Sequence, residues 1–170
     1  MVNLMIFRNL TQKDIPLIVS AFTEIGWNKP TSFFEKYLEE QTNNKRCVWV
    51  AFKEKVFAGY VTLKWQSDYA PFREQGIPEI SDLNVLPKFR NQGIASTLLD
   101  LAETEVFKKS AMVGIGVGLS ADYGNAQKLY VKKGYIPDGQ GITYDYQPVK
   151  FANIVHLDDS LILWFTKRVS

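Results

Sequence analysis

The segment Arg90-Asn91-Gln92-Gly93-Ile94-Ala95 joins two regions of the chain that have different periodicities. The apolar-rich residues 79–86 before it predict a strand, and residues 94–108 after it predict a helix. A strand that enters a helix through a glycine turn suits phosphate binding, because the free N–H groups and the dipole of the first helical turn attract anions. Gly93 lets the backbone approach the anion closely, and Arg90 adds a permanent cation. The segment therefore predicts an anion site.

The composition is that of an ordinary globular protein, with 170 residues, 46% apolar residues and a net charge of +2. The length predicts a single domain over residues 1–170 with a sizeable core. The basic residues form no cluster interleaved with aromatic residues, so a nucleic-acid partner is not expected. Neither a run of about 18 apolar residues nor a signal-peptide pattern occurs, so we expect no membrane association and a cytoplasmic location.

Cys47 and His156 are the single cysteine and the single histidine of the chain. One cysteine excludes an internal disulfide, and the two residues together are too few for a Cys/His metal site, so no metal is expected. Cys47 lies in the apolar run 47–52, which predicts a buried strand in which the thiol is a small apolar side chain rather than a nucleophile.

The spacing of apolar residues predicts an α/β mixture around one sheet. The expected strands are residues 4–10, 46–52, 56–65, 79–86, 112–119, 135–146 and 161–165, the sixth broken at Pro137-Asp138-Gly139. Two helices are expected to begin after the caps Thr11 and Thr31, and two more are expected to span residues 94–108 and 122–133. Residues 66–78 are expected to form a loop.

Bulky residues alternate with Gly114, Gly116 and Gly118 in the strand expected at residues 112–119. Because successive side chains of a strand point to opposite faces, this strand has one bulky face and one bare face. Either a closely packed helix or an extended ligand can occupy the bare face, and helix packing is favoured by this segment alone. The glycine spacing does not match a dinucleotide-binding turn.

Three segments match, in order, the pattern of one enzyme superfamily. The first is Asp82-Leu83-Asn84-Val85 with Arg90-x-x-Gly93-x-Ala95, the second is the strand at residues 112–119, and the third is Asn125-Ala126 followed by Leu129-Tyr130 and Lys133-Gly134-Tyr135. The chain resembles the GNAT superfamily of acetyl-CoA-dependent N-acetyltransferases. The resemblance covers the whole chain, with residues 79–135 as its core.

The resemblance implies a mixed, mostly antiparallel central sheet of about seven strands, flanked by helices, with strands 4 and 5 splayed apart. It also implies acetyl-CoA as co-substrate, with the pantetheine hydrogen-bonded like an additional strand. Backbone groups of Leu83 and Val85 are expected to contact the cofactor. The implied donor to the thioester carbonyl is the N–H of Val85 or of a neighbour, freed by a bulge near Leu83-Asn84. The pyrophosphate is expected to lie on Arg90, Gln92, Gly93, Ile94, Ala95 and Ser96.

Acetyl transfer needs a base that deprotonates the amine and an acid that protonates the departing thiolate. The resemblance places Glu79 at the position of a base, and a solvated carboxylate at the strand end is an equal alternative. Strand alternation groups Glu79 with Ser81 on one face and places Asp82, the competing carboxylate, on the other. The resemblance assigns Tyr130 as the acid and Asn125 as a cofactor contact, while helix packing and helix capping are their structural alternatives.

The leading hypothesis is an N-acetyltransferase that moves an acetyl group from acetyl-CoA directly to a primary amine in a ternary complex. The acceptor, a small molecule or a peptide, is not identified by the loops that should contact it, around Trp27 to Lys29 and Asp68 to Glu74. One alternative is a non-catalytic acyl-CoA-binding or sensory domain of the same fold. Another, compatible with both, is a partner module whose exposed final strand mediates homodimerisation.

Overall fold

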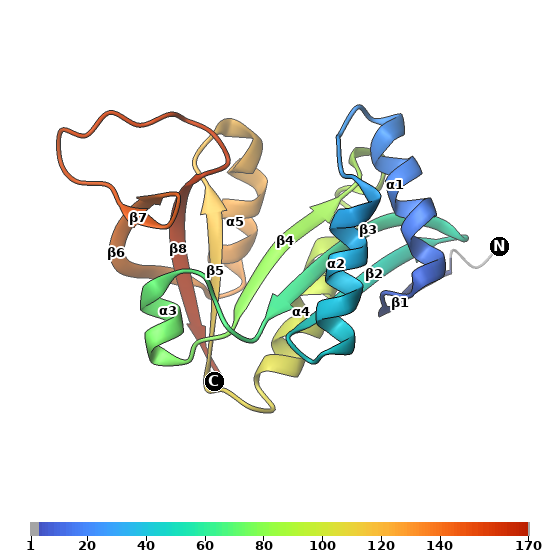
Figure 1. The fold of residues 1–170 in the computed structure, drawn as a ribbon, viewed down its shortest axis with the longest axis horizontal. Coiled ribbons are helices and arrows are strands. Elements are labelled where there is room, and N and C mark those ends of the chain that lie inside the picture. Colours follow the sequence, from blue (N-terminus) through green and yellow to red (C-terminus); the bar gives the residue numbers. More distant parts are fainter. Residues whose placement is uncertain (1–3, 170) are drawn as a thin grey trace. The chain divides into compact units, whose positions relative to one another are not determined.

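The structure, a computed structural model, describes residues 4–169 (Figure 1). Its strands are β1 (Met5–Asn9), β2 (Arg46–Lys53), β3 (Val56–Lys64), β4 (Glu79–Val85), β5 (Met112–Gly118), β6 (Ile136–Tyr144), β7 (Gln147–Pro148) and β8 (Leu161–Arg168). Its α-helices are α1 (Ile15–Glu24), α2 (Thr31–Thr42), α3 (Ala70–Gln75), α4 (Ile94–Val106) and α5 (Gly124–Lys132).

Within the described residues, the strands form an eight-stranded sheet in the order β1-β2-β3-β4-β5-β8-β6-β7. The pairs β1–β2, β2–β3, β5–β8, β6–β8 and β6–β7 are antiparallel. β4 and β5 are parallel and pair at Glu79 with Gly114 and at Ile80 with Ile115. The mixed, mostly antiparallel sheet is confirmed, and its additional strand is the two-residue β7. The splay of strands 4 and 5 stays a prediction.

The chain separates into two compact units. The first unit comprises the chain up to Lys64 together with Ser81–Thr104, and the second comprises Trp65–Ile80 together with the chain from Glu105 onward. The single domain expected over residues 1–170 stays a prediction.

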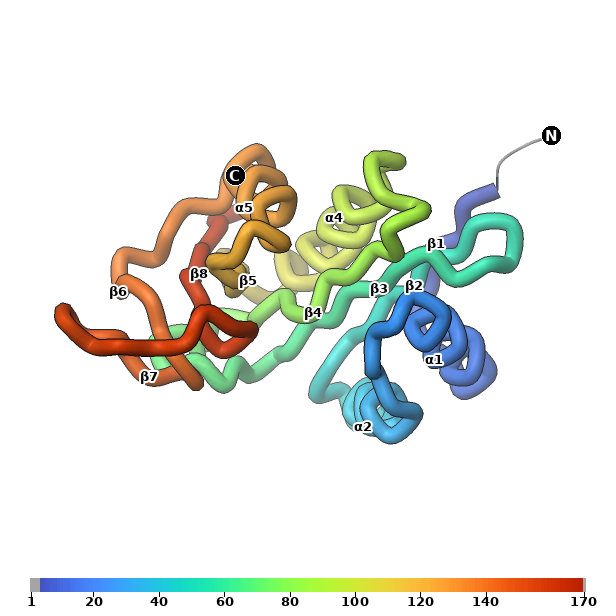
Figure 2. Tube along the Cα trace, turned by 90° about the horizontal axis from the view of Figure 1, so that it is seen from above, coloured from blue at the N-terminus to red at the C-terminus, as the bar shows by residue number. Residues whose placement is uncertain are grey.

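The core of the first unit is formed where α1 and α2 pack on the sheet. In Figure 2, α1 and α2 lie on one face of β2 and β3, and α4 lies on the other. Ile18, Phe22 and Phe34 are fully buried and share one cluster with Val50 and Tyr60. In α1 the buried residues Ile15, Ile18 and Phe22 recur at the three- and four-residue spacings that place side chains on one face of a helix, so burial of that face drives the packing.

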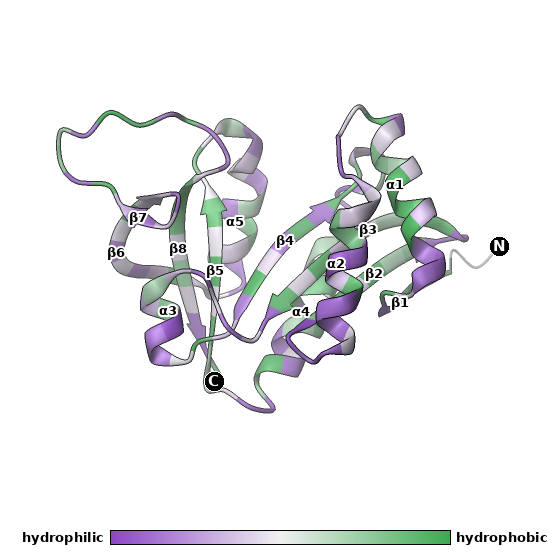
Figure 3. Cartoon of the chain, in the orientation of Figure 1, coloured by the Kyte–Doolittle hydropathy of each residue, from purple (hydrophilic) through white to green (hydrophobic). Residues whose placement is uncertain are grey.

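The second unit is built on the glycine-containing strand β5, which Figure 3 shows in alternating green and white bands. A Cβ atom at Gly114 would lie 2.1 Å from the ring of Phe72 in α3, and one at Gly118 would lie 2.4 Å from the ring of Tyr123. At Gly116 the nearest atoms, at 2.8 Å, belong to Ile162 and Trp164 of β8. Side chains of the second unit therefore fill the bare face of β5. Helix packing, the favoured alternative, describes the contact of Phe72 from α3, whereas Ile162 and Trp164 come from a strand.

Two features of the second unit differ from the sequence-based expectation. The helix α3 lies inside the segment expected to be a loop, and it carries Pro71 in its first turn and ends at Gly76 with a left-handed φ of 64°. The final strand β8 is not an exposed edge, because it pairs with β5 on one side and β6 on the other. The prediction that an exposed final strand mediates dimerisation is therefore wrong, whereas a homodimer as such stays a prediction.

Candidate functional site

The glycine turn before α4 has the geometry that the sequence predicts. Gly93 has a φ of 80°, and a Cβ atom placed there would meet no other atom within 4 Å. The first helical bond runs from the Thr97 N–H to the Gly93 carbonyl oxygen, at 3.0 Å. The N–H groups of the residues between them lie in the first helical turn, where the backbone supplies no intrahelical acceptor. The left-handed glycine thus ends the loop, and α4 begins at the next residue.

Cationic and polar side chains of the first unit lie beside this helix start. Arg90 is exposed, and its Nε donates to the Val85 carbonyl oxygen at 3.2 Å. The Gln92 side chain accepts from Lys53 Nζ at 2.7 Å and donates to the Lys88 carbonyl oxygen at 3.3 Å. Lys53 and Arg90 add positive charge to that of the helix dipole at this helix start, an arrangement suited to an anion.

The other residues predicted for the pyrophosphate differ in what they can contribute. The side chain of Ile94 is buried, with 2% exposure, so only its backbone N–H is available to a ligand. Ala95 and Ser96 are half-buried in the first turn of α4. A small side chain at Ala95 leaves the backbone amides accessible, and Ser96 can add a hydroxyl donor.

The strand β4 does not keep a regular alternation of side chains. Asp82 has a left-handed φ of 52°, although it is not a glycine. Ser81 Oγ lies 2.9 Å from Thr62 Oγ1, and the Asp82 carboxylate contacts the Tyr60 hydroxyl. Because Tyr60 and Thr62 share one face of β3, the consecutive residues Ser81 and Asp82 point to the same face. The prediction that Asp82 lies opposite Ser81 is therefore wrong, since the left-handed residue reverses the alternation.

A glycine of β3 accommodates this irregular strand. A Cβ atom at Gly59 would lie 2.5 Å from the backbone oxygen of Asn84 and 3.1 Å from Cα of Val85. Only a residue without a Cβ atom fits such a close approach of two backbones. Leu83 and Val85, the predicted backbone contacts of the cofactor, are half-buried on this part of β4.

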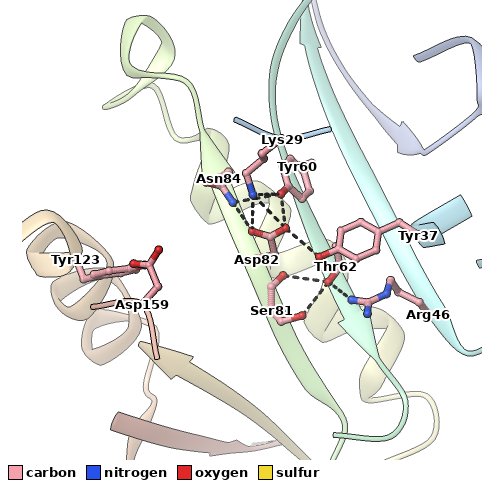
Figure 4. A network of polar contacts seen from close by, with 10 residues as sticks. All are labelled: Lys29, Tyr37, Arg46, Tyr60, Thr62, Ser81, Asp82, Asn84, Tyr123 and Asp159. Carbon is pink, nitrogen blue, oxygen red and sulfur yellow. Dashed lines mark hydrogen bonds and ion pairs between the residues drawn. The ribbon is translucent and has the colours of Figure 1, made fainter. Parts of the chain in front are cut away.

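Asp82 is the centre of a polar network in the first unit (Figure 4). Its Oδ2 accepts hydrogen bonds from the hydroxyls of Tyr60 and Tyr37, the latter at 3.0 Å. Its Oδ1 accepts from Asn84 Nδ2 at 2.7 Å and from Lys29 Nζ at 3.2 Å. Four donors from a loop, a helix and two strands therefore hold this carboxylate.

Both tyrosines of this network remain donors at neutral pH. Burial, followed by the negative charge of Asp82, raises the pKa of Tyr37 and of Tyr60 well above the ordinary tyrosine value. Sequence reasoning missed both residues, because a tyrosine at an apolar position of a helix or strand resembles any other core residue. Only the arrangement of their hydroxyls around Asp82 reveals a polar role.

Glu79, the predicted base, is the first residue of β4 and belongs to the second unit. Its side chain is buried, with 4% exposure, and its Oε2 accepts from Ser67 Oγ at 2.5 Å. The alternative of a solvated carboxylate at the strand end is therefore wrong. A buried carboxylate in a defined hydrogen bond is suited to proton transfer or to structural pairing.

Tyr130, the predicted acid, lies on α5 in the second unit and is 5% exposed. Its ring centroid lies 6.0 Å from that of Tyr135, whose N–H donates to the Tyr130 carbonyl oxygen at 3.0 Å. Burial, followed by the proximity of Tyr123, raises the pKa of Tyr130 above its ordinary value. The phenol is therefore protonated at neutral pH, as a general acid must be.

The remaining predicted contact, Asn125, is exposed in the first turn of α5. Its neighbour Gln127 donates from Nε2 to the carbonyl oxygen of Gly118 at 2.8 Å and so joins α5 to the end of β5. Sequence reasoning did not identify Gln127, because its partner is a backbone carbonyl and has no side-chain signal. The N-cap residue of α5 is Tyr123, two residues before Asn125.

Residues 4–169 contain no group of three or more His, Cys, Asp or Glu side chains that could hold a metal ion. Within the same residues, every helix is too short or too polar to cross a membrane. Cys47 lies on β2 and is half-buried.

Comparison with known proteins places these features in one family. Residues 15–135 match the family model described as "Acetyltransferase (GNAT) family". No curated protein sequence gives a significant match.

Solved structures with the same fold include three that differ widely in source. Ribosomal-protein-alanine N-acetyltransferase from Brucella melitensis is 19% identical, with 96% of this chain and 99% of that chain covered and a TM-score of 0.71. PaiA N-acetyltransferase from Thermoplasma acidophilum, in complex with coenzyme A, is 16% identical, with coverages of 98% and 99% and a TM-score of 0.67. NAA60 from Arabidopsis thaliana, in complex with acetyl-CoA, is 16% identical, with coverages of 98% and 99% and a TM-score of 0.69.

Proposed function

The chain belongs to the GNAT acetyltransferase family, and on that premise we propose that it transfers an acetyl group from acetyl-CoA to a primary amine by direct attack in a ternary complex. The observation that carries this proposal is the turn from β4 through the left-handed Gly93 into the N-terminus of α4. It supports binding of the pyrophosphate by Arg90 and by the backbone amides of residues 92–96. Coenzyme A or acetyl-CoA is bound in two of the similar structures, which supports the same cofactor here.

The cofactor contacts other than the pyrophosphate are also proposals. Leu83 and Val85 would bind through backbone groups of the irregular part of β4, with the Val85 N–H polarising the thioester carbonyl. The left-handed Asp82 supports this role, because it interrupts the regular pairing of the strand just before these residues. Asn125 would add a contact from the start of α5.

The acid and the base are assigned to Tyr130 and Glu79. Attack requires a neutral amine with a free lone pair, and Glu79 would accept the proton of the ammonium, through water. Asp82 is less suited to this task, since its carboxylate already accepts four hydrogen bonds. Tyr130, protonated at neutral pH, would donate a proton to the sulfur as the C–S bond breaks.

Initial-rate kinetics test the proposed direct transfer. The rate of CoA formation is measured while acetyl-CoA and the best primary amine are both varied. Direct attack in a ternary complex is expected to give intersecting double-reciprocal lines. Parallel lines, together with an acetylated protein detected by mass spectrometry in the absence of amine, would contradict it and indicate a covalent acetyl-enzyme.

A further inference from the structure

Lys29 occupies a site in the first unit that is built to hold an ammonium group. The loop between α1 and α2 is exposed at residues 25–28, and Lys29 is the half-buried residue that follows. Its Nζ lies 5.5 Å from the ring centroid of Phe22, 5.1 Å from that of Phe33 and 5.4 Å from that of Tyr60. The same atom donates to the Tyr60 hydroxyl at 2.8 Å and to the Asp82 carboxylate at 3.2 Å. We call this set of three rings and one carboxylate, Phe22, Phe33, Tyr60 and Asp82, the ammonium cage.

The contacts match the needs of a partly desolvated primary ammonium. The Lys29 side chain is 20% exposed and the Asp82 side chain is 21% exposed, so both charges have lost most of their water. The ring faces and the carboxylate replace that hydration, and two acceptor oxygens match two of the three N–H groups. A quaternary ammonium has no N–H group and could donate to neither oxygen, so the cage favours a primary amine.

A second ammonium can bind Asp82 only if Lys29 leaves. A carboxylate offers about four lone-pair sites, and here Tyr37, Tyr60, Asn84 and Lys29 use them. The first three donors belong to α2, β3 and β4, whereas Lys29 belongs to the loop between α1 and α2. The loop can withdraw one side chain without breaking a helix or a strand, so Lys29 is the donor that a ligand can replace.

We propose that the ammonium cage is the recognition site for the acceptor's ammonium group, and that Lys29 fills it in the free protein as an internal competitor. The acceptor is an unbranched primary alkylamine, of the kind carried by a lysine side chain or an aliphatic diamine, because the occupant now enclosed by the rings is such a chain. This inference rests on the proposed acetyl transfer, for which the cage would capture the acceptor in its protonated form. Because of this competition, the apparent affinity for the acceptor is the intrinsic affinity multiplied by the fraction of molecules in which the cage is free.

Chemical complementation tests the cage without acetyl-CoA. Lys29→Ala removes the segment that n-propylammonium resembles, and Lys45→Ala removes an exposed lysine of the same unit as the matched control. Thermal unfolding of both variants is measured with increasing n-propylammonium chloride, isopropylammonium chloride or 1-propanol. We expect n-propylammonium alone to raise the midpoint of Lys29→Ala saturably, by about 3 °C, and to leave Lys45→Ala unchanged. If the two variants responded equally, or if 1-propanol had an equal effect, the proposal that the cage binds a primary ammonium group would be overturned.

The same additives keep the test decisive if Lys29→Ala does not fold in buffer. Far-ultraviolet circular dichroism is then followed while each additive is titrated into the unfolded variant. A ligand that binds the native state shifts the equilibrium toward it, so n-propylammonium is expected to restore the folded signal and 1-propanol is not. If n-propylammonium restored the folded signal no better than 1-propanol does, the proposal that the cage binds a primary ammonium group would be overturned.

Steady-state kinetics then connect the cage to the acceptor. We expect Lys29→Ala to lower KM for n-alkylamine acceptors about tenfold and to leave KM for acetyl-CoA unchanged, because the internal competitor is gone. Acetyl transfer that proceeds with an unchanged or raised amine KM overturns the acceptor assignment while the proposed function stands. Saturable binding of n-propylammonium without acetyl transfer to any amine overturns the proposed function, and the acceptor assignment with it.

Discussion

Gly93→Glu is expected to weaken CoA binding by about 100-fold or more. The new carboxylate would stand at the N-terminal turn of α4, where the backbone amides and Arg90 are proposed to hold the pyrophosphate. Unit charges about 4 Å apart interact with about 4 kcal/mol at a dielectric constant typical of a protein surface, and each 1.4 kcal/mol is a factor of about ten in affinity. Isothermal titration with CoA at low and high salt measures the loss, which is expected to shrink as salt screens the repulsion.

Two controls separate charge from backbone strain in this experiment. Gly93→Ala introduces a Cβ atom at the same φ of 80° without a charge, and it is expected to cost about 1–2 kcal/mol of stability with a much smaller loss of CoA affinity. Gly76→Glu places the same carboxylate at another left-handed glycine, with a φ of 64°, at the C-terminus of α3. If Gly93→Glu bound CoA as tightly as Gly76→Glu does, the phosphate-binding role of this turn would be refuted.

Tyr130→Phe is expected to reduce kcat by roughly 100- to 10,000-fold, the range typical of general acid catalysis. The substitution removes one hydroxyl and keeps the buried ring that packs on Tyr135. Burial raises the pKa of Tyr130, so the wild-type phenol stays protonated through neutral and moderately alkaline pH. The loss of rate is therefore expected to be similar from about pH 6 to pH 9, and pH–rate profiles of both proteins measure it.

Tyr144→Phe is the matched control, since it removes a hydroxyl from a half-buried tyrosine of the same unit, which donates to the Asp158 carboxylate at 2.8 Å. Its kcat is expected to equal that of the wild type. Glu79→Gln, assayed beside it, is expected to lose a comparable factor at neutral pH, because a buried amide cannot accept the amine proton. Turnover by Tyr130→Phe at the wild-type rate across this pH range would show that another group protonates the thiolate.

The elements that local patterns encode were predictable from the sequence. The strand before the glycine turn, the turn itself and α4 follow from apolar periodicity and from a glycine at a helix start. Gly93 has a left-handed φ, whereas its role in binding a phosphate stays a prediction. The bare face of β5 follows from strict alternation. Its occupants do not, because Phe72 and Trp164 lie more than 35 residues away along the chain on either side.

The face that Asp82 occupies could not be predicted, because strand alternation assumes extended backbone at every residue. The left-handed φ at Asp82 depends on Gly59 of another strand and on the donors around its carboxylate. Aspartate tolerates this conformation better than most residues, yet no pattern in the sequence of β4 predicts a left-handed residue at this position. The interior position of β8 was easier to predict from the sequence. Leu161 to Phe165 are apolar without alternation, as is typical of a strand buried on both faces.

Acetyl transfer to a primary amine, the central claim, is tested most directly by assaying the wild-type protein with acetyl-CoA and a panel of primary amines. The panel should include n-alkylamines, diamines, a lysine-containing peptide and a peptide with a free N-terminus. Release of the CoA thiol is recorded, and the acetylated amine is identified by mass spectrometry. The account predicts CoA release matched mole for mole by an acetylated primary amine. Tight CoA binding with no release across the panel would contradict it and would favour a non-catalytic acyl-CoA-binding domain.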